Sequence, residues 1–114
     1  MIKSLPQRLS DIKSNAVLID AGAVRQLLAE QLALVIDVRE PQEYAQTHAD
    51  SAINIPRGVL EMQVIEKVST PDFPIVLYCA SSARAKLGAE QLEKMGYTNL
   101  YVITCPIDVI AKTL

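Results

Sequence analysis

A cysteine at the end of an apolar run is the residue whose surroundings in this sequence could support chemistry. The run Ile75-Val76-Leu77-Tyr78 is typical of a buried strand, and Cys79 follows it directly. Between Cys79 and Arg84, at the start of a helical pattern, stand four small residues, Ala80, Ser81, Ser82 and Ala83. Ligands of open α/β sheets bind beyond the carboxyl ends of strands. Because small side chains let the backbone curl, we expect the N–H groups of this loop to surround one anion.

The groups expected around Cys79 would favour its thiolate. A helix begins near Arg84, and the positive end of its dipole attracts negative charge. Arg84 adds a fixed charge and planar donors for an oxyanion. Cysteines in such surroundings have pKa values lowered from about 8.5 to between roughly 3.5 and 7.5. We therefore expect Cys79 to act as a nucleophile without a general base, with Ala80 through Arg84 as the anion-binding group.

Simpler interpretations exist for every candidate residue. Free cysteine is among the most buried residue types, so Cys79 could merely fill space. Cys105 lacks the loop and the cation, and we expect a buried or strand-end residue there. His48 is expected to be a hydrogen-bonded structural residue. Asp37 ends a buried strand, where a carboxylate needs a partner, so we expect it to bond to backbone or to Arg39.

Length and composition exclude several function classes. The 114 residues suffice for one domain, and half of them are hydrophobic. The chain has 13 acidic and 11 basic residues, with no block of like charge. Nucleic acid is therefore not an expected partner. Residues 1–15 lack the apolar core of a signal peptide, and no stretch approaches the roughly 18 apolar residues of a membrane span, so we expect a cytoplasmic protein without a membrane partner. No metal or cofactor is expected, because two cysteines and one histidine lack ligand spacing.

Alternating strand and helix patterns predict an α/β fold. The predicted strands cover residues 16–19, 33–38, 51–55, 75–78 and 101–104. The first predicted helix follows Asp20 as its N-cap and has an apolar face that reaches Leu32. A second helix begins near Pro41, and a third occupies residues 58–68. A fourth has an apolar face from Ala85 to Met95 and a C-terminal cap at Gly96, and a last short helix begins at Pro106. Residues 16–114 are predicted to form a single domain. Residues 1–15 would be an N-terminal extension, either a docking helix built on Leu5, Leu9 and Ile12 or a mobile arm.

Two segments resemble the single-domain rhodanese-like sulfurtransferases. Residues 34–44, followed by His48 and by Ala52-Ile53-Asn54-Ile55-Pro56, are similar to the family signature D-V-R-E-P-x-E-Y … H … A-x-N-I-P. The second segment is the strand ending in Cys79, with Arg84 five positions later. The resemblance covers most of the chain, from about Ala16 to Ile103.

The resemblance implies a five-stranded parallel sheet with helices on both faces and a persulfide mechanism. Cys79 would take a sulfane sulfur from thiosulfate or a similar donor and pass it to a thiophilic acceptor, a cellular thiol or cyanide; a sulfur-acceptor protein is a further candidate partner. Arg84 matches the loop arginine of the family. Arg39 and Asp37 would be structural residues near the site, while Arg57 could reach an anionic donor.

Departures from the family pattern leave a second function open. Ser82 stands where the family often has glycine, and a positive φ there would cost about 1 to 2 kcal/mol. Thr104-Cys105-Pro106 stands where the family commonly has a pair of glycines and a tryptophan, and Cys105 could lie near the loop. These changes suggest a catalytically weak module for anion or protein binding. A phosphatase or arsenate reductase is the third possibility, although those enzymes have a longer loop between the cysteine and the arginine.

Overall fold

The computed structural model describes residues 1–114 and contains one five-stranded parallel sheet. Its strands are β1 (Val17–Ile19), β2 (Leu34–Asp37), β3 (Ala52–Asn54), β4 (Ile75–Tyr78) and β5 (Leu100–Ile103). The strand order is β1-β5-β4-β2-β3, so β4 lies at the centre. Because every pairing is parallel, all carboxyl ends lie at one edge of the sheet.

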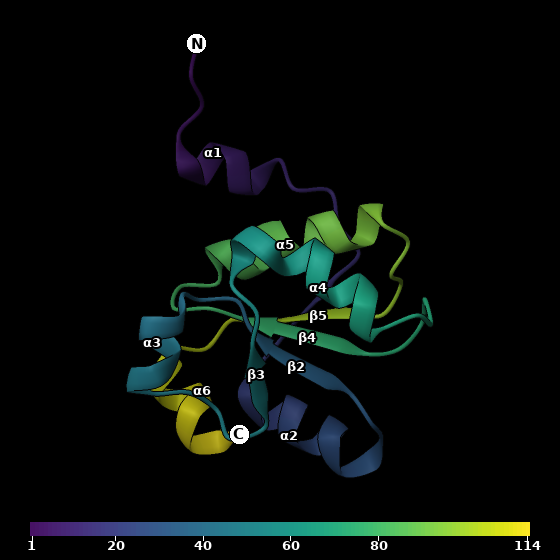
Figure 1. Ribbon diagram of the computed structural model, residues 1–114. Helices are drawn as coiled ribbons and strands as arrows, with labels where there is room; N and C mark the ends of the chain where they lie inside the picture. The colour runs from purple at the N-terminus through teal and green to yellow at the C-terminus, as the bar shows by residue number, and fades with distance from the viewer.

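Helices cover both faces of this sheet, which confirms the expected fold class. The helical elements are α1 (Leu5–Ser10), α2 (Ala21–Glu30), α3 (Pro41–Gln46), the 3₁₀ turn η1 (Arg57–Val59), α4 (Leu60–Lys67), α5 (Ala83–Lys94) and α6 (Ile107–Thr113). Figure 1 shows α4 and α5 on one face, α2 and α6 on the other, and α3 beside the carboxyl ends of the strands. None of the helices has the length and apolar character that a membrane crossing requires.

The central strand packs on both faces. Ile75, Leu77 and Cys79 belong to the apolar cluster that includes residues of α4 and α5. Val76 and Tyr78 belong to the cluster that includes residues of α2 and α6. Since successive side chains of a strand point to opposite faces, this alternation directs the thiol of Cys79 toward α5.

Local signals in the sequence locate the helix ends. The Asp20 side chain accepts the Ala23 N–H at 2.8 Å and so caps α2. Pro41 occupies the first turn of α3. Gly96 follows α5 with φ +108°, a backbone conformation that glycine adopts without strain.

The expectation that α2 reaches Leu32 is wrong. The helix ends at Glu30, and Gln31 has extended backbone angles of φ −154° and ψ 163°. This turn of the chain leaves Leu32 82% exposed.

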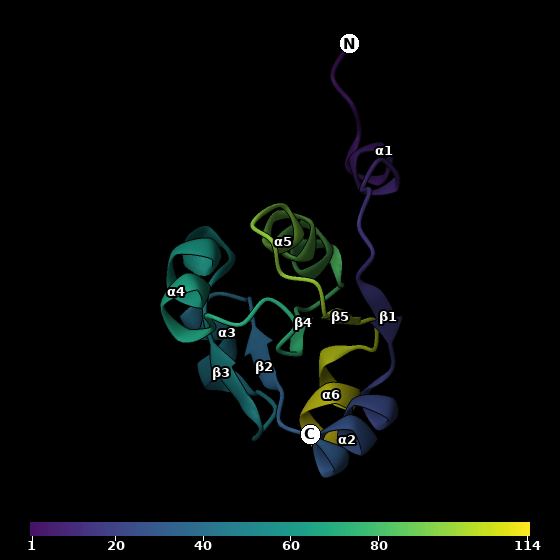
Figure 2. The same ribbon diagram turned by 90° about the vertical axis from the view of Figure 1, so that its right-hand side faces the viewer.

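The segment before β1 contains a short helix whose anchoring is largely polar. Figures 1 and 2 show α1 beyond α5, outside the two helical layers. Arg8 Nη2 donates to Glu90 Oε1 of α5 at 2.7 Å. Leu9 and Ile12 line a shallow apolar pocket together with Ala89 of α5, whereas Leu5 is 57% exposed. Of the three apolar residues predicted to dock the helix, only two therefore face α5.

Candidate active site

Cys79 lies directly after β4, beneath the loop that leads into α5. Its side chain is oriented toward α5 and the residue is only 1% exposed. The backbone N–H of Ala85 donates to its Sγ at 3.4 Å. Ala85 was outside the expected group of donors, although its N–H is one of those that the first turn of a helix leaves unpaired.

The loop above Cys79 presents unpaired backbone donors. The N–H groups of Ala80, Ser81, Ser82, Ala83 and Arg84 donate to no acceptor of the protein. Ala80 and Ser81 are exposed, so these donors lie at the surface above a buried sulfur. An arrangement of consecutive free N–H groups at a helix N-terminus is suited to binding an anion.

Ser82 has the left-handed backbone conformation that the loop was expected to need. Its φ is +68° and its ψ is −12°, and it is the only non-glycine residue of the chain with positive φ. Its carbonyl accepts the Lys86 N–H at 2.9 Å, which begins the hydrogen-bonding pattern of α5. The turn at Ser82 therefore converts the end of β4 into the start of the helix.

Arg84 is held by a carboxylate from another element. Its Nη1 and Nη2 donate to Glu43 Oε1 and Oε2 at 2.7 and 3.0 Å. Glu43, on α3, also accepts the Glu40 N–H at 3.0 Å as part of a capping box. The hydrogen bonds from Arg84 lower the pKa of Glu43 to about 2. The Glu43 carboxylate therefore remains paired with the loop arginine at neutral pH.

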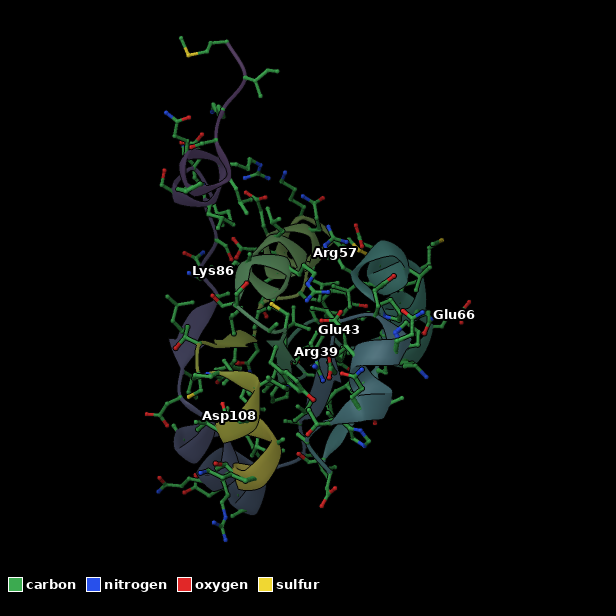
Figure 3. The ribbon with its side chains drawn as sticks, turned by 90° about the vertical axis from the view of Figure 1, so that its left-hand side faces the viewer. Arg39, Glu43, Arg57, Glu66, Lys86 and Asp108 are labelled. Carbon is green, nitrogen blue, oxygen red and sulfur yellow. The ribbon has the colours of Figure 1, made fainter.

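Arg57 is also paired with a glutamate. Its Nη1 donates to Glu61 Oε1 at 2.8 Å, across one turn of the chain. A methyl group at Gly88 of α5 would lie 3.5 Å from Arg57 Cδ, so the arginine stem runs close to that helix. Figure 3 views the carboxyl edge of the sheet and shows Arg57 and Glu43 in the space between α5 and α4.

A buried ion pair supports this edge from below. Asp37 and Arg39 are 0% and 4% exposed, and Arg39 Nη2 donates to Asp37 Oδ2 at 2.7 Å, a pairing that the sequence predicts. Arg39 also donates to the Thr47 carbonyl at 2.6 Å. The Asn54 amide donates to the carbonyls of Asp37 and Arg39 at 3.0 and 2.9 Å. These bonds join the ends of β2 and β3 to the end of α3.

His48 takes part in a separate structural contact. Its ring stacks on Tyr44 with centroids 3.8 Å apart, and its Nδ1 lies 2.7 Å from the Tyr44 carbonyl. The Tyr44 hydroxyl donates to the Ala52 carbonyl at 2.7 Å. Both contacts are local to the turn between α3 and β3.

Cys105 lies on the other face of the sheet from Cys79. It packs against the cluster that includes α2 and α6, and its Sγ accepts the Ala21 N–H at 3.3 Å. Both thiols are free. The sheet therefore separates the two cysteine side chains, even though each follows the carboxyl end of a strand.

Comparison with known proteins identifies the fold and its family. The model of the rhodanese-like domain matches residues 20–109. Thiosulfate sulfurtransferase PspE of Escherichia coli is 34% identical over 65 residues, which cover 57% of this chain and 62% of that protein. A tRNA uridine(34) hydroxylase of Buchnera aphidicola is 26% identical over 110 residues, covering 90% of this chain and 34% of that protein. The chain therefore spans less than two thirds of either relative.

Solved structures show the same architecture. The polysulfide-sulfur transferase homodimer of Wolinella succinogenes superimposes with a TM-score of 0.74 and 27% identity, covering 89% of this chain and 77% of that one. The segment that contains Cys79, its loop and Arg84 lies inside the residues that the family model matches. The chain belongs to the rhodanese-like domain family.

Proposed function

We propose that the chain is a sulfurtransferase in which Cys79 carries a sulfane sulfur as a persulfide. The donor would be thiosulfate or a similar compound, and the acceptor a thiol, cyanide or a sulfur-acceptor protein. Membership in the rhodanese-like family supports sulfur chemistry in general. The relative named as a thiosulfate sulfurtransferase supports this donor class.

The observation that carries the proposal is the set of free N–H groups above Cys79. Donors on Ala80 through Arg84 have no acceptor within the protein, and the adjacent Ala85 N–H already contacts the sulfur. A persulfide places its terminal, negatively charged sulfur one bond farther from the backbone than a thiolate does. Such an anion would extend from the buried Sγ toward these donors.

The reaction needs no redox partner or cofactor. The Cys79 thiolate attacks the outer sulfur of thiosulfate, a new sulfur–sulfur bond forms, and the bond to the departing sulfite breaks with its electron pair on sulfite. An acceptor thiolate then attacks the terminal sulfur of the persulfide. Cys79 leaves as a thiolate, and the acceptor becomes the persulfide.

The proposal is tested by loading the protein with sulfur. The full chain is incubated with thiosulfate, freed of excess reagent, and its intact mass is measured. We expect the mass of one added sulfur atom in the wild type and in Cys105→Ser, and none in Cys79→Ser. An unchanged wild-type mass, or equal loading of Cys79→Ser, contradicts the assignment.

A binding module with negligible turnover is the second candidate function. Cys79 is nearly inaccessible, and Arg84 and Arg57 are both paired with glutamates. Thiocyanate formation from thiosulfate and cyanide distinguishes the two. A rate clearly above that of Cys79→Ser supports the enzyme. Binding of thiosulfate without such a rate supports the module.

A further inference from the structure

Two arginines of this edge of the sheet, Arg84 and Arg57, are each neutralised by a glutamate. Arg84 is bound to Glu43 and Arg57 to Glu61, at 2.7 and 2.8 Å. We propose that Glu61, by pairing with Arg57, sets the charge of the sulfur donor that the site accepts. The neutralised pair then lowers the advantage that the dianion thiosulfate would otherwise have over monoanionic organic donors of sulfane sulfur. This inference rests on the proposed function and specifies its substrate class.

The Arg57 side chain lies beside α5, the helix whose first turn contacts the reacting sulfur. Its stem runs beside Gly88, which is three residues beyond Ala85 on α5. Three residues advance a helix by about 4.5 Å. The Ala85 N–H contacts Cys79 Sγ. The Arg57 stem therefore lies beside α5 about one helical turn along the axis from the residue that donates to the sulfur.

Glu61 is the group that neutralises the positive charge of Arg57. It lies four residues after Arg57, and the pair spans the boundary between η1 and α4. The Arg57 side chain is 28% exposed and that of Glu61 is 36% exposed, so solvent screens the pair only in part. An incoming anion therefore meets a neutral pair together with the backbone donors of the loop.

The charge of the donor decides how strongly this neutralisation acts. The energy of an ion near a fixed charge is proportional to the charge of the ion, so removing the Glu61 charge benefits a dianion more than a monoanion. Thiosulfate and benzenethiosulfonate differ in this respect, but both deliver a terminal sulfur to a thiolate. With benzenethiosulfonate, the Cys79 thiolate attacks the terminal sulfur and benzenesulfinate departs with the electron pair. Both transfers balance without an added oxidant or reductant.

The test compares donor preference in Glu61→Gln and in a matched control. Glu66→Gln removes the same charge from the same helix, and Figure 3 shows Glu66 directed away from the other labelled residues of this edge. For each variant, kcat/KM is measured with both donors. We expect Glu61→Gln to raise the ratio of thiosulfate to benzenethiosulfonate efficiency about three- to fivefold, mainly through KM, because the pair is partly screened. Glu66→Gln should leave the ratio unchanged.

A binding measurement keeps the inference testable without turnover. In the Cys79→Ser background, the loop amides are titrated with thiosulfate by NMR. Glu61→Gln should tighten thiosulfate binding about three- to fivefold, and the double change Arg57→Gln with Glu61→Gln should abolish that gain. Equal affinities in the Glu61→Gln and Glu66→Gln variants overturn the inference. Failure of sulfur loading together with a normal response of binding to Glu61→Gln overturns the proposed function alone.

Discussion

Ser82 is held in a backbone conformation that costs free energy. Its φ of +68° places the β-carbon too close to the following carbonyl, at a cost of about 1–2 kcal/mol. The loop requires this turn because Ser82 connects a buried cysteine to the first residue of α5. The strain is therefore a property of the site.

Replacing Ser82 by glycine should relieve this strain. A glycine also increases the entropy of the unfolded chain, which offsets part of the gain. Ser81→Gly carries the same unfolded-state cost without a positive φ in the folded state, and it is the matched control. In urea denaturation, we expect Ser82→Gly to be more stable than Ser81→Gly by about 1–2 kcal/mol. Equal stabilities of the two variants would rule out strain at Ser82.

Glu43 should make stability depend on pH in the acidic range. Its folded-state pKa of about 2, lowered chiefly by Arg84, lies below the ordinary value of 4.5. A depressed carboxyl pKa stabilises the fold above the unfolded pKa, and this contribution is lost as pH falls from about 4.5 to about 2. The side chain is 35% exposed, so screening limits the effect to less than about 1 kcal/mol.

The measurement for Glu43 is a comparison of unfolding free energies at pH 6 and at pH 3. The stability advantage of the wild type over Glu43→Gln should shrink at the lower pH. The exposed Glu30, at the end of α2, supplies the control Glu30→Gln. A difference between wild type and Glu43→Gln that stays constant with pH would contradict the role of the Arg84 pair.

At the scale of elements, α1 depends on contacts with α5 that are mostly polar. Arg8 pairs with Glu90, whose side chain is only 9% exposed. Glu93, one turn later on α5, accepts from the Ser14 hydroxyl and the Asn15 N–H at 2.9 and 2.6 Å. Arg8 lowers the pKa of Glu90 chiefly through its hydrogen bond. Two carboxylates of one helix therefore hold the N-terminal segment.

Removing Arg8 should release this segment without disturbing the sheet. Arg8→Ala leaves the largely buried Glu90 without its cation, and we expect a loss of about 1–2 kcal/mol in unfolding free energy. Amide hydrogen exchange in residues 5–10 should rise, while exchange in β4 should remain slow. Lys3→Ala, which breaks an exposed pair with Asp11, is the control and should change little. Protection of α1 that survives Arg8→Ala would assign its docking to Leu9 and Ile12.

At the scale of the molecule, the sequence predicts the elements better than it predicts their pairing. Hydrophobic period locates all five strands because each run is short, apolar and bounded by turn residues. The apolar run ending at Cys79, the four small residues after it and Arg84 also identify the strand, loop and helix around this cysteine. Strand order could not be predicted in this way. The partner of Arg84 could not be predicted either, because Glu43 is 41 positions away in the sequence and only the fold brings it close. The sequence does not single out Glu61 as a candidate site residue for another reason. A glutamate four residues after an arginine is a common surface pair of helices, so its spacing from Arg57 does not indicate a site.

The sheet should also prevent a disulfide between the two cysteines. Cys79 follows β4 with its thiol toward α5, whereas Cys105 follows β5 and accepts a hydrogen bond from the start of α2. Thiols whose β-carbons point to opposite faces cannot be joined without movement of the backbone. We expect mild oxidation with diamide to produce no intramolecular disulfide, measured as the absence of a two-hydrogen mass loss in the monomer. When a small thiol is added with the diamide, the half-buried Cys105 should form the mixed disulfide first, with diamide taking up the two hydrogens. Rapid formation of the internal disulfide would show that the segment after β5 rearranges to bring Cys105 to the loop, and would make it a candidate acceptor for the Cys79 persulfide.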